Sequence, residues 1–239
     1  MLRTILLAGL SIGLVMGQDP QAPPPEAPPP AQMIPPEGLN DMVAPIALYP
    51  DPLISQILVA ATYPLEMVQA SQWMQRNTNL RGEELTNAAA QQNWDPSVQA
   101  LVAFPDLLQR LTQDITWVTN LGNAFLNQQA DVMDAVQRMR QQAQDAGRLQ
   151  SNEQQQVSTT YDDGRPVIQI QPQDPYVIYV PDYDPGYVWG PYVYYPYPRW
   201  RYPRYNPGIY IGFGFGIPMR TYYGVGWGGW NSYGWRPGW

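Results

Sequence analysis

Two aspartates of this 239-residue chain have a spacing that could support carboxylate chemistry. Asp182 and Asp184 lie two positions apart in the run Val-Pro-Asp-Tyr-Asp-Pro, so in an extended strand both side chains would face one side. Two carboxylates on one face could bind Ca²⁺ or act as the acid and base of a glycosidase. Because aspartate before proline is common turn chemistry, we favour turn capping and solvation for this pair.

The other acidic pairs have simpler interpretations. Asp162 and Asp163 precede Gly164 between two strand-like runs, which is typical of a hairpin turn. Glu83 and Glu84 suit the N-terminus of a helix. We therefore assign no catalytic residue, no cofactor-binding residue and no metal ligand from the sequence.

Missing residue types narrow the chemistry further. The chain has no Cys, no His and no Lys, so all 13 basic residues are Arg. These absences exclude a Cys/His zinc site, a Cys nucleophile, a Ser-His-Asp triad, a Schiff-base Lys and a P-loop Lys. Carboxylates, Tyr, Ser, Thr and Arg remain for catalysis. No disulfide can form, so packing alone must stabilise the fold.

The C-terminal segment from Gly186 to Trp239 differs in composition from the rest of the chain. It contains 11 Tyr, 6 Trp, 2 Phe, 12 Gly, 7 Pro and 5 Arg, and it has no Asp or Glu. Gly and Pro interrupt helices and central strands. The aromatic rings supply flat apolar surface, and Arg supplies cation–π contacts and anion binding. This composition favours contact with a partner over packing into a core.

The strongest candidates for partner binding are tail residues with guanidinium or indole side chains: Arg199, Trp200, Arg201, Arg204, Trp227, Trp230 and Trp235. Self-association is one interpretation. Binding to a polysaccharide is a second, because aromatic faces stack on sugar rings and Arg binds acidic groups. Binding to single-stranded nucleic acid is a third, against which export argues. A disordered tail without a specific partner is the plain alternative.

The N-terminal residues 1–17 have the pattern of a secretory signal peptide. Arg3 is followed by a short apolar run from Ile5 to Met16, and cleavage before Gln18 fits the small residue that precedes it. The run is too short for a comfortable transmembrane helix, although an uncleaved anchor is the alternative. We expect an exported protein in the periplasm, cell envelope or extracellular space, with no transmembrane helix after cleavage. Residues 18–37 are rich in Pro and predict a disordered, semi-rigid linker.

Charge is segregated along the chain. Residues 18–185 contain all 20 acidic residues and carry a net charge of −13, whereas residues 186–239 carry +5. An acidic body and a basic tail allow two interpretations. The tail folds back on its own body, or it binds an external anion.

The capping signals and apolar spacing of residues 38–150 predict a helical domain of about six or seven helices. Asp51-Pro52 and Asp95-Pro96 each place an N-cap before a proline in the first turn, and Pro64 and Pro105 also suit first turns. The longest helix is expected from Ala124 to Ala146. Its apolar stripe is Phe125, Val132, Met133, Val136, Met139 and Ala143, and Gly147 is a natural stop.

Residues 151–190 change to the two-residue period of strands. A hairpin with an Asp-Gly turn is expected, followed by a third strand over Tyr176–Val180 and a fourth at Tyr187–Trp189. Such a three- or four-stranded antiparallel sheet should dock on the helices. The predicted fold is mainly α with a small β appendage (α+β), and residues 191–239 form the low-complexity tail. We expect Gly38–Gly190 to fold without that tail.

Several spaced motifs of the chain match the pattern of one known family. The first is the run Leu-Asn-Asp-Met-Val-Ala-Pro-Ile-Ala-Leu-Tyr-Pro-Asp-Pro-Leu-Ile. The motifs span Leu39–Ile54, Ala61–Glu66, Trp94–Pro105, Leu121–Gln129, Asp131–Arg140 and Val180–Gly190. These motifs resemble a bacterial exported family catalogued as domain of unknown function 3300. The resemblance implies a Gram-negative, exported protein with a Pro-rich leader and a variable C-terminus. It implies no activity, ligand or catalytic residue.

Together these features predict a non-enzymatic protein that interacts or acts as a scaffold at the cell envelope. Its partner is expected to be an envelope polymer or protein, with an acidic polysaccharide or a second copy as candidates. The alternative is a carboxylate-based hydrolase acting on cell-wall glycan. A buried carboxylate of raised pKa that faces a second carboxylate in a cleft would favour the hydrolase.

Overall fold

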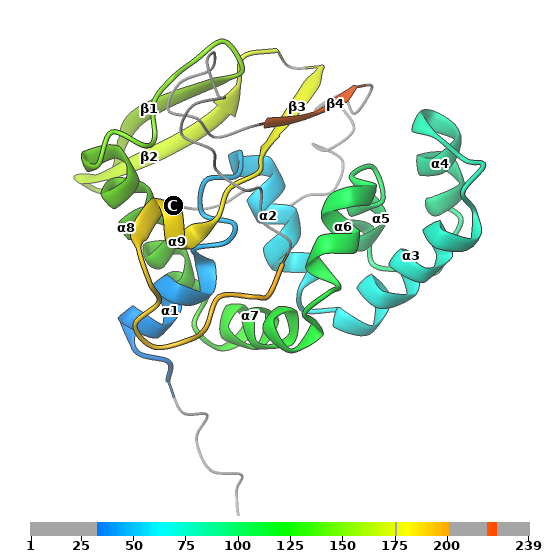
Figure 1. Ribbon diagram of the computed structural model, residues 1–239, viewed down its shortest axis with the longest axis horizontal. Coiled ribbons are helices and arrows are strands. Elements are labelled where there is room, and N and C mark those ends of the chain that lie inside the picture. The colour runs from blue at the N-terminus through cyan, green and yellow to red at the C-terminus, as the bar shows by residue number, and fades with distance from the viewer. Residues whose placement is uncertain (1–32, 175, 201–218, 224–239) are drawn as a thin grey trace, which may run out of the picture. The chain divides into compact units, whose positions relative to one another are not determined.

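The described part of the chain is mainly helical with two small sheets, so the predicted α+β class is confirmed (Figure 1). A computed structural model describes residues 33–174, 176–200 and 219–223. Its elements are α1 Pro36–Val43, α2 Asp51–Ala60, α3 Pro64–Arg76, α4 Gly82–Ala89, α5 Pro96–Leu101, α6 Pro105–Leu111, α7 Ile115–Asn127, α8 Gln129–Asp145, β1 Gln155–Asp162, β2 Arg165–Pro172, β3 Val177–Pro181, α9 Pro185–Trp189 and β4 Met219–Tyr223. Across these ranges no helix combines the length and the apolar character that crossing a membrane requires.

Proline and aspartate define several of the helix starts, as predicted. Pro64, Pro96 and Pro105 are the first residues of α3, α5 and α6, where the N–H that proline lacks would have no helical partner. Asp95 caps α5 by accepting a hydrogen bond from the N–H of Ser97 at 2.9 Å. These residues therefore specify where the helices begin before any tertiary contact is made.

Two expectations about the helices are wrong in detail. Asp51 is the first residue of α2 and not its N-cap, because Pro50 takes the N-cap position. The long helix expected from Ala124 to Ala146 is interrupted at Gln128, whose φ of −140° and ψ of 47° are not helical. The Gln128 side chain instead binds the backbone N–H and C=O of Ile34, at 2.7 and 3.1 Å. Residues 33–150 therefore form eight helices, more than the six or seven predicted.

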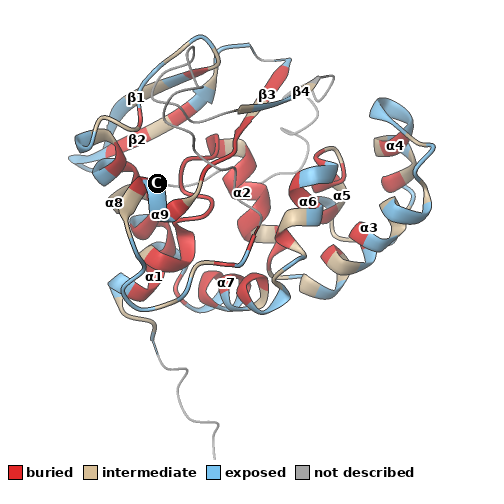
Figure 2. Cartoon of the chain, viewed as in Figure 1, coloured by how far each residue is buried: buried red, intermediate tan, exposed pale blue. Residues whose placement is uncertain are grey.

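The core lies where α1, α2, α7 and α8 meet, while α4 and the far end of α3 are largely exposed (Figure 2). Close packing at this centre requires a glycine. A Cβ atom on Gly122 of α7 would lie 2.0 Å from the carbonyl oxygen of Ala61. The chain segment after α2 therefore approaches α7 more closely than any larger residue would permit.

The strands form two sheets of two strands, not one sheet of three or four. β1 and β2 are the predicted hairpin, and Asp163 and Gly164 have φ values of 47° and 78°, as a type I′ turn requires. The predicted third strand exists as β3, but its partner is β4 from the C-terminal segment. The run Tyr187–Trp189 belongs to helix α9, because Asp184 and Pro185 start a helical turn there.

The packed structure continues beyond Gly190, where the low-complexity tail was expected to begin. Residues 191–200, which we call the strap, leave α9 and pass α1 and α7 (Figure 1). Trp200 at the end of the strap is only 5% exposed and packs edge-on against Trp117, with ring centroids 5.0 Å apart. The boundary placed at Gly190 therefore requires correction, since apolar side chains beyond it complete the core.

Candidate functional site

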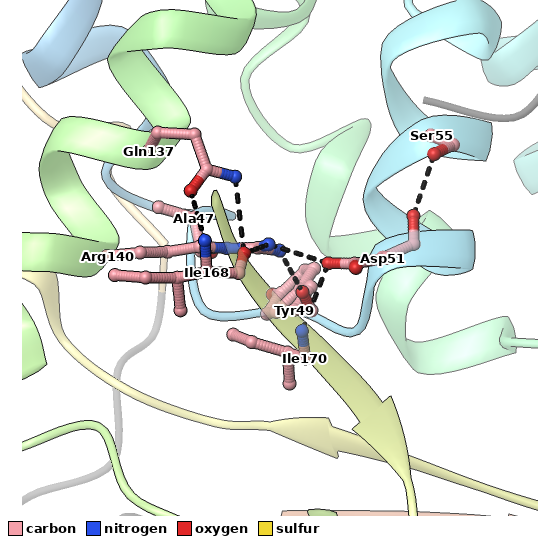
Figure 3. A network of polar contacts seen from close by, with 8 residues as sticks. All are labelled: Ala47, Tyr49, Asp51, Ser55, Gln137, Arg140, Ile168 and Ile170. Atoms are coloured by element: carbon pink, nitrogen blue, oxygen red, sulfur yellow. Dashed lines mark hydrogen bonds and ion pairs between the residues drawn. The ribbon is translucent and has the colours of Figure 1, made fainter. Parts of the chain in front are cut away.

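The fully buried guanidinium of Arg140 organises the centre of the molecule (Figure 3). Its Nε donates to the carbonyl of Ala47 at 2.8 Å, and its Nη2 donates to that of Tyr49 at 2.9 Å. Its Nη1 donates to the carbonyl of Ile168 at 2.9 Å and pairs with the carboxylate of Asp51 at 2.6 Å. One side chain of α8 thus joins the buried loop 44–50, α2 and β2.

Asp51 completes this network on the other side. The same carboxylate oxygen that pairs with Arg140 also accepts a hydrogen bond from the N–H of Ile170 at 3.3 Å. Burial raises the pKa of Asp51, while the charge of Arg140 and these hydrogen bonds oppose that rise. Since the carboxylate is occupied by Arg140 and an amide, the network stabilises structure and does not resemble a pair of catalytic acids.

The edge of β2 that faces α8 is closed by side chains as well. The Gln137 side chain accepts from the N–H of Ile168 at 2.8 Å and donates to its C=O at 3.2 Å (Figure 3). With Arg140 and Asp51, Gln137 thus satisfies backbone groups that a neighbouring strand would otherwise bind. This edge is therefore attached to the helices and is not free for a partner.

Tyr183 holds the loop 44–50 from the opposite side. Its hydroxyl donates to the carbonyl of Ala44 at 2.6 Å and accepts from the N–H of Leu48 at 3.3 Å. Its ring packs edge-on against Tyr49 and Trp189, with centroids 6.1 and 5.7 Å away. Three of the motifs that carry the family resemblance, Leu39–Ile54, Asp131–Arg140 and Val180–Gly190, therefore meet at one buried loop. The residues of these motifs therefore stabilise the fold around this loop.

Asp182 and Asp184 take different roles and do not form a two-carboxylate site. Asp184 caps α9, accepting from the N–H of Gly186 at 2.8 Å, as the turn-capping interpretation predicts. Asp182 is only 8% exposed and pairs with Arg110 at 2.6 Å and Arg220 at 3.1 Å, so the solvated role expected for it is wrong. Over the described ranges, no group of three or more His, Cys, Asp or Glu could hold a metal ion.

The ion pairs of Asp182 belong to a larger cluster that we call the charged junction: Asp106, Arg110, Asp182 and Arg220. Arg220 of β4 also pairs with Asp106 at 2.8 Å, and its side chain remains 44% exposed. Burial lowers the pKa of Arg220, but the hydrogen bond and the charges of the two aspartates outweigh that effect and raise it. The junction attaches β4 to the body.

Tyr222 reinforces this attachment through its ring. It packs edge-on against Phe104, with ring centroids 5.0 Å apart, and burial raises the pKa of its hydroxyl to about 12. Burial likewise raises the pKa of nearby Tyr49 to about 12, against the opposing effect of Arg110. Both tyrosines are therefore neutral at physiological pH and act as apolar surface with a polar tip.

The strap is fixed to the body by a carboxylate of α1. Asp41, only 6% exposed, accepts hydrogen bonds from three successive backbone amides, those of Val193 at 3.0 Å, Tyr194, and Tyr195 at 2.9 Å. Successive N–H groups that converge in this way form an anion-binding concavity, which a side chain of the same molecule fills here. With Trp200 buried at the far end, the strap is anchored at two points.

At the Asp41 anchor the strap presents side chains outward. Tyr192, Val193 and Tyr194 are 51%, 81% and 55% exposed, and Tyr187 of α9 is 47% exposed. We call these four residues the tyrosine surface. The guanidinium of Arg148 lies 4.7 Å from the ring centre of Tyr187, within cation–π distance. The tyrosine surface thus combines exposed rings with a nearby positive charge.

Two of the seven predicted binding residues, Arg199 and Trp200, lie in the described part of the chain. Arg199 is exposed on the strap, in keeping with a binding role. The prediction that Trp200 binds a partner requires correction, because its indole is buried against Trp117 and cannot meet an external partner. The others lie outside the described residues: Arg201, Arg204, Trp227, Trp230 and Trp235.

Sequence reasoning missed Asp41 and Arg140, although one of them had a visible signal. Arg140 lies four residues after Val136 and three before Ala143, and so on the stripe predicted to be buried. A charge on such a stripe predicts a buried carboxylate partner. Asp41 had no comparable signal, because its partners are backbone amides more than 150 residues away in the chain.

The comparisons with known proteins identify a family and name no activity. The family model described as "Protein of unknown function (DUF3300)" matches residues 36–237. The chain is 41% identical over 180 residues to "Uncharacterized protein YacH" of Escherichia coli (strain K12). That match covers 64% of this chain and 29% of the relative, so the chain spans well under half of the relative's length. No solved structure matches the chain.

Proposed function

Because the chain belongs to the DUF3300 family of proteins of unknown function, we propose a role from its own surface, as an exported interaction or scaffolding protein of the cell envelope. In this proposal the tyrosine surface contacts an envelope glycan that carries acidic groups. The residues 1–17 that suggest export lie outside the described residues, so the location belongs to the proposal. The role requires no chemical reaction at the site.

The observation that carries the proposal is the way the strap is held. Asp41 fixes the backbone of residues 193–195, while Tyr192 and Tyr194 stay about half exposed. Exposed aromatic side chains usually lower the solubility of a protein. Several of them on an anchored segment therefore support an interaction surface there. Because the backbone is already ordered, little conformational entropy is lost when a flat ligand stacks on the rings.

Charge near the tyrosine surface favours a ligand with acidic groups. Arg148 lies beside Tyr187, and Arg199 is exposed near the end of the strap. The body as a whole is acidic, with a net charge of −13 over residues 18–185, and would repel a polyanion elsewhere. A polymer with both sugar rings and scattered carboxylates fits this arrangement better than a uniformly charged one.

The described carboxylates do not form the pair that the alternative, a carboxylate-based hydrolase, requires. Asp182 is ion-paired with two arginines, Asp184 caps a helix, and Asp51 is paired with Arg140. The raised pKa of Asp51 satisfies one expectation for such an enzyme. Its carboxylate, however, faces a guanidinium and an amide, where the hydrolase would need a second carboxylate.

The test is a binding titration with a soluble acidic polysaccharide such as polygalacturonate. Tyr192→Ser combined with Tyr194→Ser should weaken binding about tenfold at both low and high salt, because ring stacking is not screened. Arg199→Gln should weaken binding at low salt only. Circular dichroism of each variant checks that the helices remain.

The matched control uses two other exposed tyrosines. Tyr161 of β1 and Tyr176, which directly precedes β3, are 76% and 73% exposed and belong neither to the strap nor to α9. The double variant Tyr161→Ser/Tyr176→Ser should bind like the parent. If it loses as much affinity as the strap variant, exposed tyrosines act non-specifically and the proposed surface is wrong.

A further inference from the structure

β4 lies against β3 as an added strand, and residues 201–218 join it to the rest of the chain. The antiparallel register runs from Val177 opposite Tyr223 to Pro181 opposite Met219. Thr221 is exposed, and the Arg220 side chain is 44% exposed. β4 is therefore held by backbone pairing and a small number of side-chain contacts.

Two alternate side chains of β4 make those contacts. Arg220 and Tyr222 lie two positions apart, so they project from the same side of the strand. Arg220 pairs with Asp106 and Asp182, and the ring of Tyr222 packs on Phe104. The edge of β3, an acidic pair and an aromatic ring together form a site for an extended segment with the pattern Arg-x-Tyr, a recognised mode of peptide binding by strand addition.

We propose that this site also binds β4 of a second copy of the chain, so that two copies associate by exchanging strands. The pairing, the ion pairs and the ring contact join β4 only to β3, to Asp182 and to the start of α6. The same set of contacts therefore forms whether β4 comes from the same copy or from another. Exchange between two copies is reciprocal and closes as a symmetric dimer.

Chain length and charge both allow the exchange. Residues 201–218, if fully extended, span up to about 60 Å, enough to reach a neighbouring molecule. Residues 186–239 carry +5 and no acid, whereas residues 18–185 carry −13, so the tail of one copy is attracted to the body of another. In dilute solution the copy's own β4 is favoured by its high effective concentration, and exchange increases with protein concentration. This inference is independent of glycan contact at the tyrosine surface.

The absence of cysteine permits a direct test, because a cysteine introduced into the chain is its only thiol. Pro181 has no N–H, so its pair with Met219 is a non-hydrogen-bonded one, and so is the pair Tyr179–Thr221 two residues along. The Cα atoms of such a pair lie about 4.5 Å apart, within the range that a disulfide requires. Tyr179→Cys and Thr221→Cys are therefore made as separate full-length proteins and mixed in a glutathione redox buffer at increasing concentration.

Strand exchange predicts a mixed disulfide dimer of the two variants in about tenfold excess over either homodimer, where random collision gives about twofold. The matched control replaces Thr221→Cys by Met219→Cys. That cysteine lies on the same face but two residues out of register with Tyr179, beyond disulfide reach. High salt should reduce the mixed dimer, because Arg220 is partly exposed.

The double variant Tyr179→Cys/Thr221→Cys decides between the remaining outcomes. If it closes a disulfide within one chain while the mixture yields no more mixed dimer than the out-of-register control at any concentration, β4 docks only within its own copy and the proposal is overturned. If no disulfide forms in either arrangement, the β3–β4 pairing itself is contradicted. Should Tyr179→Cys fail to fold, the pair Pro181→Cys with Met219→Cys repeats the test in the same register.

Discussion

Arg140 and Arg220 both bind aspartates, but only Arg140 is fully buried. The Arg140 side chain is 0% exposed, and its hydrogen bonds reach two carbonyls of the loop 44–50, one carbonyl of β2 and Asp51. The Arg220 side chain is 44% exposed, and its partner Asp106 is 61% exposed. The first ion pair is enclosed by the core, whereas water and salt reach the second.

The difference shows which ion pair the fold depends on and which one can exchange. A buried charge that loses its partner retains the full cost of removal from water. An exposed pair gains little, because water and dissolved ions replace each partner. We therefore regard the Arg140 network as architecture and the charged junction as a reversible contact, and the following predictions test that distinction.

The largest effect is expected from Arg140→Met. The variant leaves Asp51 buried as an unpaired anion and should lower the free energy of unfolding by about 3–5 kcal/mol. The second substitution Asp51→Leu should recover most of this loss, since it removes the unpaired charge. Urea unfolding followed by circular dichroism measures both values.

The pH dependence of that variant has a definite sign. The pKa of Asp51 is already raised by burial above its ordinary value of 3.8, and loss of Arg140 removes the main opposing effect. A carboxyl whose folded-state pKa is raised adds stability below its unfolded-state pKa and loses that contribution as pH rises through the folded-state pKa. The deficit of Arg140→Met should therefore be smaller at about pH 4 than at neutral pH. As a control, Arg138→Met on the same helix should cost less than about 1 kcal/mol, because this half-buried side chain donates to the neutral Asn40 Oδ1 at 3.0 Å and, among the described residues, forms no ion pair with an aspartate.

An intermediate effect is expected from shortening the chain at two points. Ending the chain at Trp200 removes β4 and the charged contact of Arg220, at a cost of about 1 kcal/mol. Ending it at Gly190 also removes the strap, which exposes Trp117 and leaves Asp41 without its three amides, for a further loss of about 1–3 kcal/mol.

This pair of truncations also revises the expectation that Gly38–Gly190 folds fully without the tail. Helical circular dichroism should persist in both proteins, but thermal unfolding of the shorter one should begin at a lower temperature. Equal stability of the two would mean that the strap contributes nothing to the core.

The smallest effect is expected from Arg220→Gln. It should lower the free energy of unfolding by at most about 1 kcal/mol at low salt and by less at high salt. Amide hydrogen exchange should increase in β3, where β4 docks, and stay unchanged in α8. Arg165→Gln is the matched control, because Arg165 is 72% exposed and lies 3.9 Å from Asp134. A loss as large as that of Arg140→Met would show that the junction belongs to the core after all.

Much of the local structure could be predicted because its causes lie within a few residues. Asp95 with Pro96 starts α5, and Asp163 with Gly164 closes the hairpin turn. The break at Gln128 could not be predicted, because its side chain is held by Ile34, far away in the sequence. The prediction of a strand at Tyr187–Trp189 is wrong, because so short a run shows no period, and these residues belong to the helix Pro185–Trp189.

The candidate site was harder to predict than the fold. The composition of residues 186–239 indicated aromatic contact surface, and the exposed Tyr192 and Tyr194 are consistent with it. Composition does not distinguish an exposed ring from a buried one. It therefore predicts that Trp200 binds a partner, whereas Trp200 belongs to the core. Which aromatic residues face outward depends on contacts with α1 and α7.

Helix starts, the hairpin, the acidic body and the basic aromatic tail can be predicted from the sequence, since propensity, capping and net charge are local or additive properties. Three contacts depend on the packing of distant segments: Arg140 pairs with Asp51, Asp41 holds the strap, and β4 pairs with β3. Each of these contacts joins residues about 40 to 150 positions apart, and any of the other arginines or aspartates could have satisfied the same chemistry. Burial selects among them, because only a particular packing removes water from one pair and leaves it at another.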